Sequence, residues 1–115
     1  MEIFVRDLVE RLHIDENLYP NILICLTEAV NNAIIHGNQL DEHKEIQVSC
    51  HEKEHEIHFI ISDEGSGFDP FKLPDPTSEG RVETEGGRGV FLMKQLTDEI
   101  DFLDQGRTVK LMWKI

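Results

Sequence analysis

ILICLTEAVNNAIIHG, residues 22–37, is the stretch that decides the fold. Its apolar residues recur at intervals of three and four, which is the spacing of one face of an α-helix. Asp15 or Asn17 is placed to cap such a helix before it begins. We predict a long helix that runs to His36 and stops at Gly37. Its predicted core stripe consists of Leu23, Leu26, Val30, Ala33 and Ile34.

Three polar residues of the same stretch follow one another at intervals of four: Glu28, Asn32 and His36. This spacing stacks them along one flank of the helix, which we predict to lie opposite the core stripe. Glu28 is suited to accept a proton from a hydroxyl or a water, and the amide oxygen of Asn32 is a suitable ligand for Mg²⁺. On spacing alone, a helix face that is merely solvated is the more common alternative.

Hydrophobic spacing also assigns the segments on either side of this helix. The predicted elements are a first helix with its core face at Phe4, Val5, Leu8, Val9 and Leu12, a hairpin of strands at 46–50 and 57–61, a third helix at 90–96, and a second hairpin at 99–103 and 108–115 with its turn at 104–107. The strands cluster in hairpins instead of alternating with helices. We therefore predict an α+β fold: a two-layer α/β sandwich with a largely antiparallel sheet and three helices on one face. Residues 1–115 are expected to form a single domain.

A glycine-containing turn follows the second predicted strand. Asp63 comes directly after that strand and precedes Gly65 and Gly67. The carboxylate can accept a hydrogen bond from an exocyclic amine, and the glycines let a flat base approach the backbone. From about residue 69 to residue 89 the chain loses its periodicity and gathers prolines and glycines. Such a stretch inside a compact domain predicts a functional lid or a disordered loop.

A second glycine segment, Gly86-Gly87-Arg88-Gly89, leads into the third predicted helix. Free backbone N–H groups and the positive end of the helix dipole can bind phosphates at such a place. Arg88 adds a fork of donors for phosphate oxygens. A flexible hinge with a surface arginine is the alternative, and each glycine turn is weak evidence by itself.

Several familiar motifs are either absent from this chain or lie in the wrong structural context. The string His51-Glu52-Lys53-Glu54-His55 matches the zinc-protease pattern, but it straddles a predicted hairpin turn, so its histidines do not share a helical face. His58 lies beyond it as an imaginable third ligand. The chain has no Walker phosphate loop, and its glycine turns do not sit in the parallel unit that a dinucleotide fingerprint requires. We therefore interpret the histidine string as a solvated polar turn.

Composition narrows the possible partners and location. The 23 acidic and 11 basic residues give a net charge of -12, which disfavours binding to nucleic acids or to anionic membranes. The two cysteines, Cys25 and Cys50, lie in apolar segments and are too few for a disulfide framework. We expect a reducing, cytoplasmic location. No segment is expected to reach the roughly 18 apolar residues that a membrane-spanning helix needs.

Taken together and in this order, the segments resemble the GHKL ATPases, a family that includes DNA gyrase B, Hsp90, histidine kinases and MutL. Glu28-Ala29-Val30-Asn31-Asn32-Ala33 with His36-Gly37 resembles the N box of that family, and the run from Asp63 to Pro70 resembles its first glycine box. Gly87-Arg88-Gly89-Val90 with the following Phe91, Leu92 and Met93 resembles the second glycine box. The form of the N box and the small size are similar to those of the anti-sigma factor serine/threonine kinases.

The resemblance implies that ATP binds between the long helix and the lid, with Mg²⁺ bridging Asn32 to the phosphates. It implies that Glu28 is the general base and that Asp63 recognises adenine. The nucleotide-binding positions that it implies are Asn32, His36, Asp63, Gly65, Gly67, Gly87, Arg88, Gly89, Val90 and Thr108. The implied acceptor of the γ-phosphate is a serine or threonine of a small anti-anti-sigma-like partner, with a sigma factor as a further partner of a kinase homodimer.

The chain departs from this pattern at its start. Kinases of this branch have a strand before the first helix, whereas the present sequence begins inside the segment predicted as that helix. Either the first strand is missing from the protein or the sequence is a truncated form, and both alternatives affect dimerisation and sigma binding more than ATP binding. Two alternative functions stay open: the ATP-binding domain of a histidine kinase phosphorelay, and a non-catalytic, nucleotide-dependent binding module.

Overall fold

The computed structural model describes residues 1–65 and 85–115, with residues 85–88 described by their backbone alone. The predicted lid at 69–89 therefore lies almost wholly outside the described residues, as does Gly67. The elements are α1 (Glu2–Arg11), the short helix η1 (Glu16–Leu18), α2 (Tyr19–Asn32), the π-helical turn η2 (Ala33–Gly37), β1 (Gln47–Lys53), β2 (Glu56–Ser62), α3 (Glu85–Leu96), β3 (Glu99–Leu103), η4 (Asp104–Gly106) and β4 (Thr108–Lys114).

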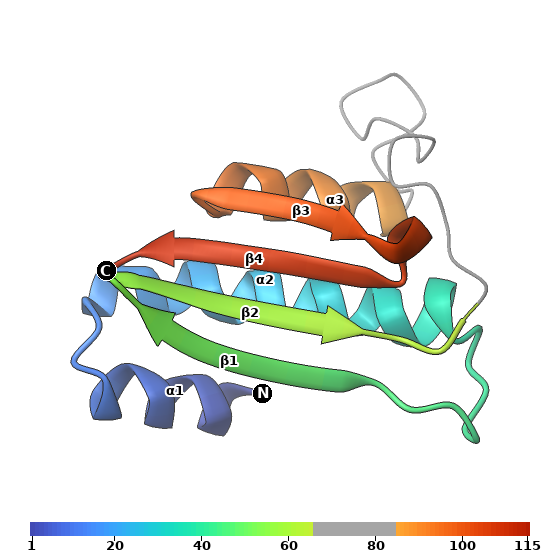
Figure 1. Cartoon of the computed structure of the whole chain (residues 1–115), viewed down its shortest axis with the longest axis horizontal. Helices are drawn as coiled ribbons and strands as arrows, with labels where there is room; N and C mark the ends of the chain where they lie inside the picture. Colours follow the sequence, from blue (N-terminus) through green and yellow to red (C-terminus); the bar gives the residue numbers. More distant parts are fainter. Residues whose placement is uncertain (66–84) are drawn as a thin grey trace.

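The described strands form one antiparallel sheet in the order β1-β2-β4-β3, and α1, α2 and α3 lie together on one side of it (Figure 1). Alternation along the strands explains this layering, because every second residue of β2 is buried against the helices. The buried side chains of the two central strands are Ile57, Phe59, Ile61, Val109, Leu111 and Trp113 on this face. The predicted α+β class and its two-layer, antiparallel architecture are confirmed.

The buried side of α2 is rotated from the predicted one. Its buried residues are Ile22, Cys25, Leu26, Ala29 and Asn32, followed by Ala33 in the π-helical turn. Of the predicted core stripe, Leu23 and Val30 are only partly buried and Ile34 is 38% exposed. The rotation has a tertiary cause, because α3 packs along the flank of α2 that carries Glu28 and Asn32. The prediction that this polar flank lies opposite the core is therefore wrong.

The third helix begins earlier than predicted, at Glu85 instead of Val90. Its first turns contain Gly86, Gly87 and Gly89, and glycine is a poor helix former by itself. Close packing on α2 explains the glycine at position 89, because a Cβ there would lie 2.8 Å from Glu28 Oε2. In α1, Val5, Leu8 and Val9 are buried as predicted, but Phe4 is 42% exposed.

The helical run Glu16–Gly37 is long enough and apolar enough to cross a membrane by length and composition, which corrects the expectation that no segment approaches this limit. In the structure it is the central helix of the domain, and Ile22, Cys25 and Leu26 are completely buried against neighbouring elements. A core helix of a globular domain passes the same test.

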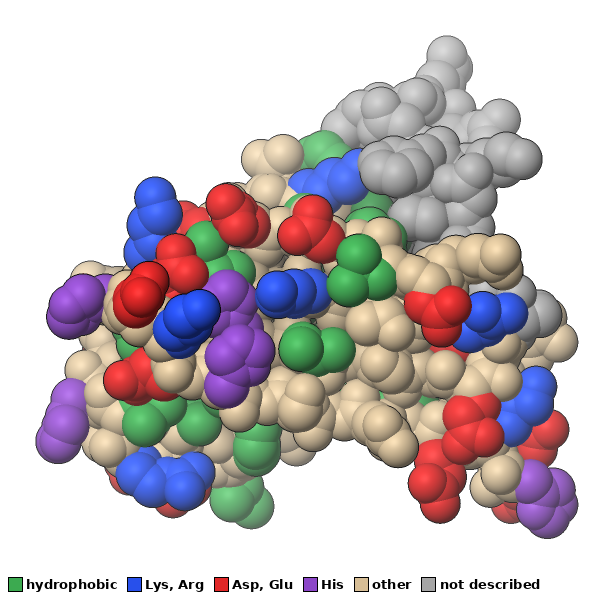
Figure 2. Space-filling model, viewed as in Figure 1, with side chains coloured by type: hydrophobic (Ala, Val, Ile, Leu, Met, Phe, Trp, Pro, Cys, Tyr) green, Lys and Arg blue, Asp and Glu red, His purple; other side chains and the backbone are tan. Residues whose placement is uncertain are grey.

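The outer face of the sheet, seen in Figure 2, carries interspersed acidic and basic side chains.

Phe59→Ala is expected to lower the free energy of unfolding by about 3–5 kcal/mol, because it removes a completely buried ring that packs edge-on against Trp113. Urea unfolding followed by circular dichroism measures the change. Ile3→Ala is the matched control, since Ile3 is 86% exposed and its loss should change the value by less than about 0.5 kcal/mol. A loss below about 1 kcal/mol in Phe59→Ala would contradict this placement of the core.

Candidate functional site

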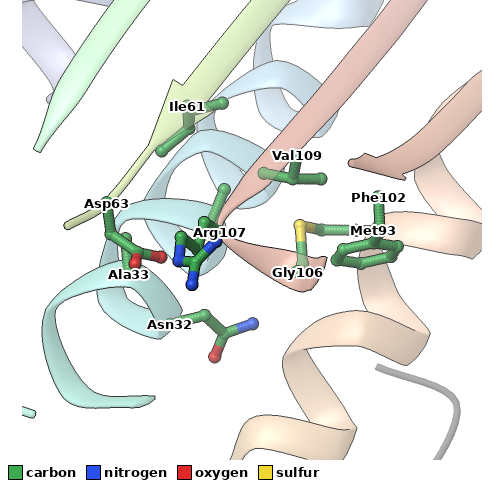
Figure 3. Close-up of a pocket in the computed structure, with 10 residues that line it drawn as sticks. Asn32, Ala33, Ile61, Asp63, Met93, Phe102, Gly106, Arg107 and Val109 are labelled. Atoms are coloured by element: carbon green, nitrogen blue, oxygen red, sulfur yellow. The ribbon is translucent and has the colours of Figure 1, made fainter. Parts of the chain in front are cut away.

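A pocket lies between α2, α3 and the ends of β2 and β4 (Figure 3). Its enclosed volume is about 10 Å³, which is room for about one water molecule. Apolar side chains form most of its wall, and the polar residues Asn32, Asp63 and Arg107 line it as well. Small-molecule pockets of proteins commonly run from about 300 to 1,000 Å³. The space enclosed by the described residues is therefore much smaller than a small-molecule pocket, and it is the polar residues lining it that indicate a ligand site.

Asp63 stands at the end of β2 and is only 9% exposed. Its Oδ1 accepts a hydrogen bond of 2.8 Å from the backbone N–H of Gly65, and its own N–H donates to the carbonyl of Arg107 at 2.9 Å. Burial raises the pKa of the Asp63 carboxyl, and the Gly65 N–H, Arg107 and Lys44 partly oppose this rise. The structure therefore holds a desolvated carboxylate at a fixed position on the pocket wall.

Two glycines allow the end of α2 to contact the turn after β2. A Cβ atom on Gly37 would overlap the Asp63 carboxylate, and one on Gly65 would overlap the carbonyl group of Gly37. Gly37 closes the π-helical turn η2, and such turns are frequent at functional sites. The two segments can approach this closely only because both positions lack a side chain.

Asn38 connects the same two segments, the end of α2 and the turn after β2, by hydrogen bonds. The sequence did not predict this role. It is 3% exposed, its Nδ2 donates to the Glu45 carbonyl at 3.2 Å, and its Oδ1 accepts from the Glu64 N–H at 2.8 Å. These bonds join the loop after η2 to the turn after β2. The only available sequence signal was an asparagine directly after a helix-ending glycine, which ordinarily indicates no more than a cap.

Glu28, Asn32 and Gly89 meet where α2 contacts the beginning of α3. A Cβ on Gly89 would lie 2.8 Å from Glu28 Oε2 and 3.3 Å from Asn32 Nδ2, which shows how closely the three groups pack. Asn32 is 6% exposed, and its Nδ2 has no hydrogen-bond partner within the described part of the chain. An unpartnered buried amide is costly. The Nδ2 atom is therefore available to donate a hydrogen bond to a ligand.

The other predicted site residues are placed as follows. The Nε2 atom of His36 is buried and has no partner among residues 1–65 and 85–115. Gly87 and Arg88 lie in the first turn of α3, whose leading N–H groups are unpaired by helix geometry. Val90 is buried in the core and anchors this end of α3. Thr108 does not line the pocket, and its hydroxyl pairs with that of Ser62 at 3.0 Å.

The zinc-protease string lies across the β1–β2 hairpin, as the sequence predicted. His51 belongs to β1 and His55 to the turn, so they do not share a helical face. The His51 ring instead stacks on the His58 ring, with centroids 4.8 Å apart, and His58 Nε2 pairs with Glu56 Oε1 at 3.0 Å. The interpretation of this string as a polar turn fits its place in the fold.

Comparison with known proteins gives one family and a set of relatives. Residues 2–113 match the model of the histidine kinase-like ATPase domain. The chain is 32% identical over 87 residues to the anti-sigma F factor of Shouchella clausii, covering 73% of this chain and 59% of that protein. It is 31% identical over 100 residues to the serine-protein kinase RsbW of Oceanobacillus iheyensis, covering 82% and 63%. The chain thus spans about three fifths of the length of these curated relatives.

Asp63→Asn is expected to raise the free energy of unfolding at neutral pH, because the amide still accepts from the Gly65 N–H while a buried charge is removed. Folding raises the pKa of this carboxyl above its ordinary 3.8, so its contribution to stability is full below that value and is lost as the pH rises through the raised pKa. The advantage of the variant over the wild type should therefore grow as the pH is raised from about 3 to about 7.

Urea unfolding at a series of pH values measures this difference. Asp101→Asn is the matched control, because Asp101 is exposed and its replacement should leave stability within about 0.5 kcal/mol at each pH. An Asp63→Asn variant that is less stable than the wild type at neutral pH would show that attraction to Arg107 and Lys44 outweighs burial.

Proposed function

This chain belongs to the histidine kinase-like ATPase domain family, and we propose that it is an ATP-dependent serine/threonine kinase of the anti-sigma factor type. Its substrate is proposed to be a serine or threonine of a small anti-anti-sigma-like protein. The observation that carries the proposal is the convergence of Asp63 and Asn32 on one pocket, with Glu28 beside Asn32 at the start of α3. The names of the relatives, anti-sigma F factor and serine-protein kinase RsbW, support it.

ATP is proposed to bind with its base against Asp63 and its phosphates toward α3. The Asp63 carboxylate accepts a hydrogen bond from the exocyclic amine of adenine, and Gly65 and Gly67 let the base approach the backbone. Gly87, Arg88 and Gly89 serve the phosphates near the positive end of α3, and Val90 holds that end in the core. His36 and Thr108 are also proposed to bind the nucleotide, and Thr108 would do so from outside the described pocket.

Asn32 is the residue proposed to hold Mg²⁺. Its amide lies buried beside Glu28 and Gly89, and the amide oxygen Oδ1 is the atom that would bind Mg²⁺, which takes oxygen ligands from one or two protein groups together with substrate phosphates. The unpartnered Nδ2 is a hydrogen-bond donor and would serve a phosphate oxygen instead. A bound Mg²⁺ supplies positive charge that offsets the charge of the triphosphate. In a chain with a net charge of -12, the protein itself has few cations to spare for that purpose.

Glu28 is proposed to act as the general base. It accepts the proton of the acceptor hydroxyl as that oxygen attacks the γ-phosphorus, and the bond to ADP breaks. The products are a phosphoserine or phosphothreonine, ADP and a protonated Glu28 that later releases its proton to solvent. We also propose that the protein binds a sigma factor and that a longer form of it is a homodimer. Its proposed location is the cytoplasm.

Mg²⁺ with ATP is expected to raise the melting temperature of the chain, because a ligand selective for the native state adds about 2.7 kcal/mol at 100 times its Kd. For a domain of this size the shift is roughly 10 °C. Asp63→Asn should lose most of the shift, while the exposed control Asp101→Asn keeps it. No shift in the wild type at millimolar nucleotide would refute ATP binding.

Glu28→Gln is expected to slow phosphoryl transfer at least about 100-fold, because the amide cannot accept the hydroxyl proton. Its affinity for ATP should stay within about threefold of wild type, since the replacement is isosteric. Transfer is measured with labelled ATP and a co-encoded anti-anti-sigma-like protein, and Glu10→Gln on the exposed side of α1 is the control.

The same assay separates the alternatives. Label on serine or threonine that depends on Glu28 supports the kinase. Label on histidine of a partner would instead indicate a phosphorelay, and ATP binding without transfer to the partner would indicate a nucleotide-dependent binding module.

A further inference from the structure

Arg107 joins two distant segments of the chain at the pocket. It stands between η4 and β4, and its Nε donates to the carbonyl of Gly65 at 2.7 Å, across 42 positions of sequence. Its backbone carbonyl accepts the N–H of Asp63 at 2.9 Å. A single residue therefore holds both ends of the 63–65 turn, one through its main chain and the other through its side chain.

The position of Arg107 is itself fixed by the turn before it. Its Nη1 pairs with Asp104 Oδ1 at 3.1 Å, and its N–H donates to the Asp104 carbonyl at 3.1 Å. Asp104 and Gln105 have positive φ angles of 52° and 58°, a conformation that persists only where neighbouring contacts maintain it. The guanidinium is thus held on a closed turn, with its side chain 30% exposed.

The Asp63 carboxylate depends on the 63–65 turn for its orientation. Its Oδ1 is bound by the Gly65 N–H, so a displacement of Gly65 rotates the carboxylate. Gly37 restrains the turn by contact on one side, and Arg107 restrains it by hydrogen bonds on the other. The charged groups that act on this carboxylate are Arg107 and Lys44, which favour its ionised form, and Asp104, which disfavours it.

We propose that Arg107 is the positioning residue for base recognition: it holds the 63–65 turn so that Asp63 presents its carboxylate to an exocyclic amine. This inference rests on the proposed function, in which Asp63 reads adenine. A hydrogen bond to a carboxylate is directional and weakens steeply when its angle is lost. Removal of the Arg107 side chain should therefore reduce recognition of the amine more than binding of the rest of the nucleotide.

The test compares ATP with purine riboside triphosphate, in which a hydrogen replaces the exocyclic amine. A hydrogen bond to a charged group typically contributes about 1.5–3 kcal/mol, so the wild-type chain should prefer ATP by about tenfold or more. In Arg107→Met the preference is expected to fall to about threefold or less. Dissociation constants for both nucleotides, with Mg²⁺ present, are measured by isothermal titration calorimetry.

The preference is a ratio of two affinities of the same folded molecules, so a general loss of stability does not change it. Arg11→Met is the matched control, because Arg11 is an exposed arginine on α1 paired with Asp7, and it should keep the wild-type preference. If Arg107→Met does not fold, Arg107→Lys keeps the charge without the Nε donor and is expected to lose preference as well.

The outcomes distinguish this inference from the function on which it rests. Failure of the unaltered chain to bind ATP would overturn the proposed function and this inference with it. ATP binding by the wild type with an unchanged preference in the folded Arg107 variant would overturn the positioning role alone. An equal loss of affinity for both nucleotides, which leaves the ratio intact, would overturn it as well, because that result marks a purely structural arginine.

Discussion

The close contact between the end of α2 and the turn after β2 is the constraint on which the site depends. Gly37 and Gly65 approach one another so closely that a Cβ on either would overlap the opposite segment. Because Asn32 belongs to the same helix as the π-helical turn that ends at Gly37, this contact sets the place of Asn32 relative to Asp63. The start of α3 completes the arrangement, since Gly89 packs against Asn32.

Charge is the second constraint, because an acidic chain has to accommodate both a buried carboxylate and a proposed triphosphate. Arg107 and Lys44 favour the ionised form of Asp63 against the cost of its burial. In the proposed function, the negative charge of the triphosphate is offset by the positive end of α3 and by Mg²⁺ at Asn32. Local placement of a few positive groups therefore matters more here than the net charge of -12.

The sequence predicted those features that depend on short-range patterns. The alternation of apolar residues placed β3 at 99–103, in agreement with the structure, and helical spacing identified α2. It failed where packing between elements overrides local preference. The start of α3 was predicted too late, because the three glycines of its first turns are poor helix formers. Asn32 was predicted to be solvated, but it is buried because α3 packs against that flank of α2. No local sequence pattern predicted the structural roles of Asn38 and Arg107, because their hydrogen-bond partners are distant in sequence.

By itself, the sequence determined the two-layer architecture, the candidate residues Glu28, Asn32 and Asp63, and the family to which their motifs belong. Periodicity and short motifs encode these properties within a few neighbouring residues. The tertiary structure alone decided that Asn32 and Asp63 share a pocket, and that Arg107 holds the turn beside it. Such contacts join segments separated by dozens of residues, so they exist only once the helices have packed on the sheet.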